Sequence, residues 1–75
     1  MNVAESREYL NSIPEDEPVF ILRGRDRLST TTIKAWLDNA RKCGVEAEKI
    51  KGVQKQFNAI VAFQTKYPER TKLPD

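Results

Sequence analysis

Two apolar stripes at helical spacing, separated by one glycine, constrain the fold more than any other feature of this sequence. The first stripe repeats at positions i, i+3, i+4 and i+7, and consists of Ile33, Trp36, Leu37 and Ala40. The second consists of Ile50, Val53, Phe57, Ile60, Val61 and Gln64. Gly44 lies between the stripes and supplies the left-handed residue that commonly ends a helix. We therefore expect an antiparallel helical hairpin over residues 29–66.

Length and composition predict a single small domain over residues 1–75 and exclude several classes of function. No apolar run approaches the roughly 20 residues of a membrane span, so neither a span nor a signal peptide is expected. The chain has no histidine and one cysteine, which argues against a zinc site, a structural disulfide and a histidine-dependent triad. We therefore expect no enzyme activity, catalytic residue, metal or cofactor. A lone thiol without a secretion signal is typical of a cytoplasmic protein.

The part that precedes the hairpin predicts a short helix and an extended segment. Asn2 is placed to cap a helix over residues 1–13, with Glu5 at the third helical position as in a capping box. Residues 14–28 should form an extended connector and strand: prolines bound the acidic connector, and Val19–Arg23 is rich in β-branched and aromatic residues. Residues 67–75 are expected to be an extended tail.

The predicted strand needs a partner, because its alternate residues are apolar on both faces and one strand leaves its backbone unpaired. The partner would be the tail around Lys72–Leu73, or the same strand of a second subunit. The alternative is an extended segment that packs over the hairpin with no ladder. We expect a mostly α fold in which this strand pairs across a homo-oligomer.

A candidate anion site follows the strand. An extended backbone over residues 23–27 would place Arg23, Arg25 and Arg27 on one side, directly before a helix N-terminus that attracts anions. Guanidinium groups match phosphate oxygens in two-point geometry, and Gly24 would let a ligand approach the backbone. Hydroxyl groups at the helix start would add donors. The expected ligand-binding residues are Arg23, Arg25, Arg27, Ser29, Thr30 and Thr31.

The same residues also have a purely structural interpretation. The three arginines could pair with acidic residues of the connector, while Ser29 or Thr30 caps the helix. Residues 1–26 hold three arginines against six acidic residues, a balance of −3, and residues 27–75 hold ten basic residues against five acidic ones, a balance of +5. An acidic arm could therefore lie on a basic body. Lys51 and Lys55 share a face of the second hairpin helix, which favours a solvated surface over a nucleic-acid interface.

Glu17–Arg23, Asp26 and the ending Lys72–Asp75 resemble segments of small, mostly uncharacterised proteins of tailed bacteriophages and prophages. The resemblance covers residues 17–75, and Arg25 and Arg27 lie outside its pattern. It implies no settled activity and no catalytic residue. Small phage proteins often act by binding inside the host cell, either by blocking a host defence protein or by sequestering a nucleotide signal.

We therefore expect a non-enzymatic, oligomeric accessory protein that counteracts host defence by binding a phosphate-bearing nucleotide in the host cytoplasm. The alternatives are an inhibitor that contacts a host protein, and a small nucleic-acid-binding dimer. No membrane partner is expected.

Overall fold

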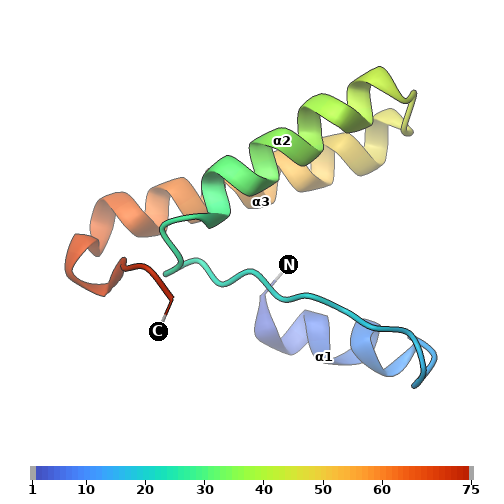
Figure 1. Cartoon of the computed structure of the whole chain (residues 1–75), viewed down its shortest axis with the longest axis horizontal. Coiled ribbons are helices and arrows are strands. Elements are labelled where there is room, and N and C mark those ends of the chain that lie inside the picture. The colour runs from blue at the N-terminus through green and yellow to red at the C-terminus, as the bar shows by residue number, and fades with distance from the viewer. Residues whose placement is uncertain (1, 75) are drawn as a thin grey trace.

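A hairpin of two helices forms the body of the protein. The computed structural model describes residues 2–74 and has three α-helices, α1 (Val3–Asn11), α2 (Ser29–Lys42) and α3 (Ala47–Lys66), followed by the 3-10 turn η1 (Pro68–Arg70). Helices α2 and α3 lie side by side along most of their length, and α1 lies apart from them (Figure 1). The predicted helical hairpin is confirmed. None of the helices described over residues 2–74 is long and apolar enough to span a bilayer.

The hydrophobic core lies between α2 and α3 and is small. Among residues 2–74, the hydrophobic side chains that are buried are Leu37 and Ala40 of α2 and Ile60 of α3, which are 2%, 5% and 6% exposed. Trp36 belongs to the predicted apolar stripe, yet 42% of it is exposed. Each helix is covered on one side by the other, so a stripe wider than one contact line cannot be fully buried.

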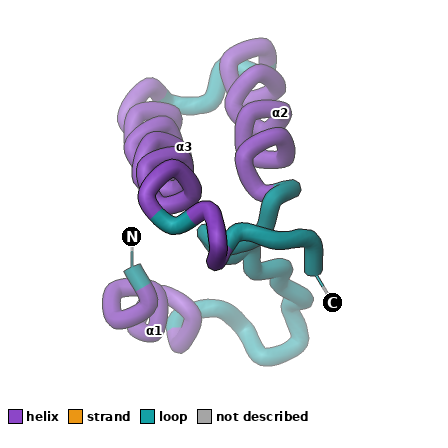
Figure 2. The backbone as a smooth tube through the Cα atoms, turned by 90° about the vertical axis from the view of Figure 1, so that its left-hand side faces the viewer, coloured by secondary structure: helices purple, strands orange, loops and turns teal. Residues whose placement is uncertain are grey.

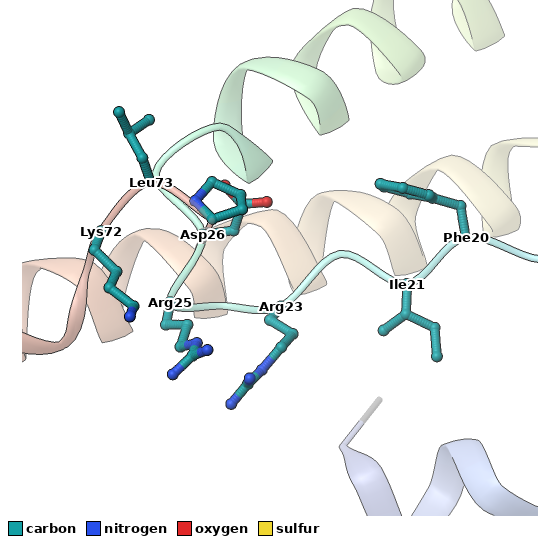
Figure 3. Close-up of a pocket in the computed structure, with 8 residues that line it drawn as sticks. Phe20, Ile21, Arg23, Arg25, Asp26, Lys72 and Leu73 are labelled. Carbon is teal, nitrogen blue, oxygen red and sulfur yellow. The ribbon is translucent and has the colours of Figure 1, made fainter.

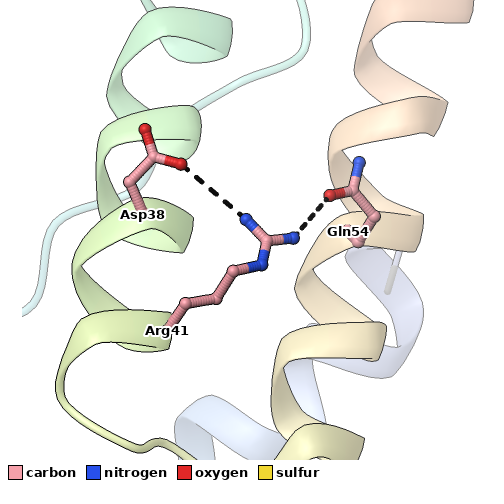
Figure 4. A network of polar contacts seen from close by, with 3 residues as sticks. All are labelled: Asp38, Arg41 and Gln54. Carbon is pink, nitrogen blue, oxygen red and sulfur yellow. Dashed lines mark hydrogen bonds and ion pairs between the residues drawn. The ribbon is translucent and has the colours of Figure 1, made fainter.

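The two helices are joined by a tight turn and one polar cross-connection. Gly44 adopts the left-handed conformation with φ +73°, as predicted, and so ends α2 without steric cost. The Arg41 guanidinium lies 3.8 Å from the Asp38 carboxylate and donates a hydrogen bond of 3.2 Å to Oε1 of Gln54 on α3 (Figure 4). This pair is exposed and contributes little to stability.

Substitution of Gly52 tests whether this glycine in α3 has a packing role. A Cβ added at Gly52 would meet no atom within 4 Å, so no neighbouring side chain needs the space. We expect Gly52→Ala to raise the free energy of unfolding by about 0.5–1 kcal/mol, because alanine loses less backbone entropy in a helix. Urea denaturation measures the change. Gly44→Ala is the control and should destabilise the protein, since its left-handed conformation disfavours a side chain; a loss of stability with Gly52→Ala would contradict the prediction.

Helix α1 is correctly predicted but does not join the core. Oδ1 of Asn2 accepts a hydrogen bond of 3.0 Å from the backbone N–H of Glu5, as expected for a cap. None of its described side chains is buried, and α1 makes no contact with α2 or α3. Tyr9 is 56% exposed and Leu10 is 38% exposed. Figure 2 shows α1 separate from the hairpin and joined to it through a long loop.

The prediction of a strand is wrong for the single chain. Across residues 2–74 no strand forms, and Val19–Arg23 is a drawn-out segment without backbone pairing (Figure 1). The tail was one of the two predicted partners of the strand. It does form backbone bonds, but with residues that follow the segment and not with the segment itself. An isolated parallel bridge joins Asp26 to Lys72, and the N–H of Lys72 donates to the carbonyl of Arg25 at 2.9 Å.

A tight turn explains this difference. The N–H of Asp26 donates to the carbonyl of Arg23 at 3.0 Å, which reverses the chain before a ladder can extend. The tail is not wholly extended either, because η1 precedes the bridge. Asp75, the last residue of the predicted tail, lies outside the described residues. Pairing of the segment across a homo-oligomer remains a prediction.

Candidate anion-binding site

The loop between the drawn-out segment and α2 is shaped by its own hydrogen bonds. Oδ1 of Asp26 accepts a bond of 2.8 Å from the N–H of Leu28, and the carbonyl of Asp26 accepts one of 3.1 Å from the N–H of Ser29. The N-cap of α2 is Leu28, which makes no side-chain capping bond, so capping by Ser29 or Thr30 is wrong. A carboxylate of the chain itself thus lies at the positive end of α2.

The side chain of Gln64 on α3 anchors this loop through hydrogen bonds. Its Nε2 donates bonds of 2.9 Å to the carbonyls of Gly24 and Asp26, and lies 3.4 Å from the Ser29 hydroxyl. Ser29 is 0% exposed, and its hydroxyl donates to the carbonyl of Asp26 at 2.8 Å. Ser29 is therefore part of the internal support and not a ligand donor, contrary to the prediction. The polar side chain of Gln64 within an apolar stripe was the sequence signal for this role.

Aromatic side chains at the end of α3 complete the support of the loop and the tail. A Cβ on Gly24 would lie 3.7 Å from Phe63, so this glycine faces α3. The prediction that Gly24 lets a ligand approach the backbone is therefore wrong. The rings of Phe63 and Tyr67 are 5.2 Å apart, and the Arg70 guanidinium lies 4.8 Å from both. These contacts engage Arg70 away from the candidate site.

An open hollow of about 330 Å³ lies where the loop meets the tail. Arg23 and Arg25 project side by side from the loop, and Lys72 reaches the same side from the tail (Figure 3). The other lining residues are Phe20, Ile21, Asp26, Leu73 and Pro74. We call this the Arg23–Arg25–Lys72 hollow. Two segments that are far apart in the sequence therefore line one hollow.

Of the six predicted ligand-binding residues, the structure brings two into this hollow. Arg23 and Arg25 line it, whereas Arg27 does not; the turn interrupts the period of two, and the N–H of Arg27 donates to the carbonyl of Lys72 at 3.0 Å. Thr30 and Thr31 lie in the first turn of α2 and do not line the hollow. Sequence reasoning missed Lys72 as a site residue, because only the fold brings the tail here.

The hollow is positively charged. The two arginines of its lining outnumber the one carboxylate of Asp26, which already accepts the bond from Leu28. Neither Arg23 nor Arg25 forms an ion pair at 4.0 Å or less with a carboxylate of residues 2–74. The structural interpretation proposed that the arginines pair with the acidic connector of their own chain. For Arg23 and Arg25 this is wrong.

Metals and known proteins add no further assignment. No group of three histidine, cysteine, aspartate or glutamate side chains is placed to hold a metal ion in the described part of the chain. Comparison with known proteins finds no family model that matches the chain, no similar curated protein and no similar solved structure.

Proposed function

We propose that this protein binds a phosphate-bearing ligand in the Arg23–Arg25–Lys72 hollow and does so without catalysing a reaction. The observation that supports the proposal is the parallel arrangement of the Arg23 and Arg25 guanidinium groups, neither of which is within 4.0 Å of a described carboxylate. Guanidinium groups keep their charge in any environment and bind phosphate oxygens in pairs.

The apolar lining favours an organic phosphate over inorganic phosphate. Phe20, Ile21 and Leu73 also line the hollow. In Figure 3 the Ile21 side chain points to the same side as the two arginines, whereas those of Phe20 and Leu73 point to the other side, so Ile21 is the apolar side chain placed to contact a base or sugar while the arginines hold the phosphate. A volume of about 330 Å³ is at the lower end of the range for small-molecule sites. A mononucleotide-sized ligand fits this description.

The biological role that agrees with this site is sequestration of a nucleotide. Among the expectations set by the phage resemblance, a binding protein that counteracts host defence in the host cytoplasm needs a ligand site and no catalytic group. The Arg23–Arg25–Lys72 hollow is our candidate for that ligand site. A nucleotide signal is therefore the ligand class to test first.

Loss of both arginines should remove binding. We expect Arg23→Ala/Arg25→Ala to weaken nucleotide affinity at least tenfold, on the order of two lost charge-assisted contacts, while the far-ultraviolet circular dichroism stays unchanged. The measurement is calorimetric titration and thermal shift with mononucleotides, cyclic oligonucleotides, phosphate and short DNA at about 0.15 M salt.

Lys51→Ala/Lys55→Ala is the matched control, because it removes the same charge from the exposed face of α3. An equal loss in both double variants would show that binding follows net charge and not the hollow. If the arginine variant unfolds, those side chains are structural and the site is wrong. If no nucleotide binds, the alternatives are tested by capture of a host protein and by the salt dependence of DNA binding.

A further inference from the structure

The chain exposes more surface than a compact monomer of its size. Its accessible surface is 6332 Å², whereas a compact protein of 8.6 kDa exposes about 4,700 Å². The radius of gyration is 13.5 Å, against about 11 Å for a compact chain of this length. Two copies together thus expose about 3,000 Å² in excess, within the range of about 2,000–5,000 Å² that obligate homodimers bury.

Three exposed apolar residues lie next to one another in the drawn-out segment. Val19 is 53% exposed, Phe20 86% and Ile21 66%, and no backbone group of residues 19–22 bonds to other backbone within residues 2–74. Such a segment presents unpaired N–H and C=O groups that favour pairing with another strand. Leu10 and Asn11 of α1 line a hollow together with Val19, whereas Phe20 and Ile21 remain largely exposed and open to a partner. Helix α1 itself lies apart from the hairpin (Figure 2).

The charges that flank the segment identify the partner as a second copy in antiparallel orientation. Glu15 and Glu17 precede the apolar residues, and Arg23 and Arg25 follow them at equal distances from Phe20. Antiparallel pairing centred on Phe20 therefore places Glu17 opposite Arg23 of the other copy, and Glu15 opposite Arg25. Parallel pairing would place like charges opposite each other, which is destabilising. Neither acid is within 4.0 Å of a described cation in its own chain.

Pro18 selects the hydrogen-bond register. With Phe20 in a non-hydrogen-bonded pair across the two-fold axis, Val19 and Ile21 exchange the backbone bonds, and the missing N–H of Pro18 faces outward. We propose that two copies of this chain dimerise through such a ribbon of residues 15–25, with Phe20 packed on its symmetry mate. The dimer does not require the ligand, but it engages Arg23 and Arg25, which also line the proposed ligand hollow, so dimerisation and ligand binding are expected to compete.

Cysteine cross-linking tests both the dimer and its register. In a Cys43→Ser background, which removes the exposed free thiol, Phe20→Cys places two cysteines with Cα atoms about 4.5 Å apart, within disulfide range. Val19→Cys is the matched control, since its symmetry mate lies about 7–8 Å away on the diagonal. We expect Phe20→Cys to oxidise to the dimer at least tenfold faster. Equal rates, or a wild-type chain that sediments as a monomer up to about 1 mM, would overturn the proposal.

Charge reversal separates this dimer from ligand binding. Glu17→Arg alone and Arg23→Glu alone each bring like charges opposite each other, and each should weaken self-association about tenfold. Mixing the two variants restores both pairs and should yield the heterodimer. A mixture that stays monomeric would reject the register. Glu17→Arg keeps Arg23 and Arg25, so retained nucleotide binding by its monomer would leave the proposed function standing if the dimer fails. A wild-type chain that cross-links in this register yet binds no nucleotide would leave the dimer standing without the proposed function.

Discussion

Gln64→Glu is expected to detach the loop from α3 and to abolish ligand binding, although the two side chains have the same shape. The amide Nε2 donates to the carbonyls of Gly24 and Asp26 at 2.9 Å. A carboxylate offers these oxygens no proton and adds a negative charge beside them in a partly buried position. The expected cost is about 2–4 kcal/mol in the free energy of unfolding, the order found when a buried acceptor is left unsatisfied and faces a charge.

The measurement combines urea denaturation with nucleotide titration, and Gln54→Glu is its matched control. Gln54 lies on the same helix, where its Oε1 accepts from Arg41 and its Nε2 donates to Oδ1 of Asn58 at 3.1 Å, both in exposed positions. A carboxylate there loses the second bond to solvent and gains charge assistance in the first, so stability should change by less than about 0.5 kcal/mol. If Gln64→Glu binds the ligand as the wild type does, the loop does not depend on this amide, and its role in positioning the arginines is refuted.

Leu37→Ala is expected to leave a large fraction of the chain unfolded. Leu37 is the most buried hydrophobic side chain described, at 2% exposure, and shares the core with Ala40 and Ile60. Such truncations cost about 2–5 kcal/mol, and one core in a domain of this size supplies only about 3–5 kcal/mol in net stability. The helical signal in circular dichroism should fall at 25 °C and its urea midpoint should shift toward zero.

Leu28→Ala provides a control with the same chemical change. Leu28 is 52% exposed and precedes α2 without a side-chain capping bond, so its truncation should cost less than about 1 kcal/mol. Equal effects of the two substitutions would show that the hairpin is not held together by this core. A stable dimer would raise the midpoint of both variants with protein concentration, so both are measured at one concentration.

The helical hairpin was predictable because its information is local. Spacing of three and four residues over two long segments, and a glycine between them, predicts two amphipathic helices and their turn. The strand was not predictable in the same way, because Val19–Arg23 has the composition of a strand and lacks a partner in its own chain. Composition reports what a segment favours once it is paired, and pairing is a property of the fold.

The candidate site was predictable only in part for a related reason. Arg23 and Arg25 lie two residues apart and on one side of a drawn-out backbone, which alternation in the sequence indicates. Arg27 follows a turn that alternation cannot foresee. Lys72 enters the hollow through the bridge to Asp26, and the burial of Ser29 depends on Gln64, 35 residues further along the chain. Contacts between residues this far apart in the sequence leave no periodic pattern from which they could be predicted.

The hydrogen bonds from Gln64 to the loop also have a consequence for the order of folding. Helices α2 and α3 follow each other through a short turn, so their contacts close small loops and are expected to form early in folding. The bonds from Gln64 to Gly24 join residues 40 positions apart, and the tail must dock afterwards to complete the hollow. We therefore expect the proposed ligand site to assemble after the helical hairpin and to open before it by sub-global unfolding. A bound ligand would select the closed loop and slow its opening, while the helical hairpin beneath it stays as it is.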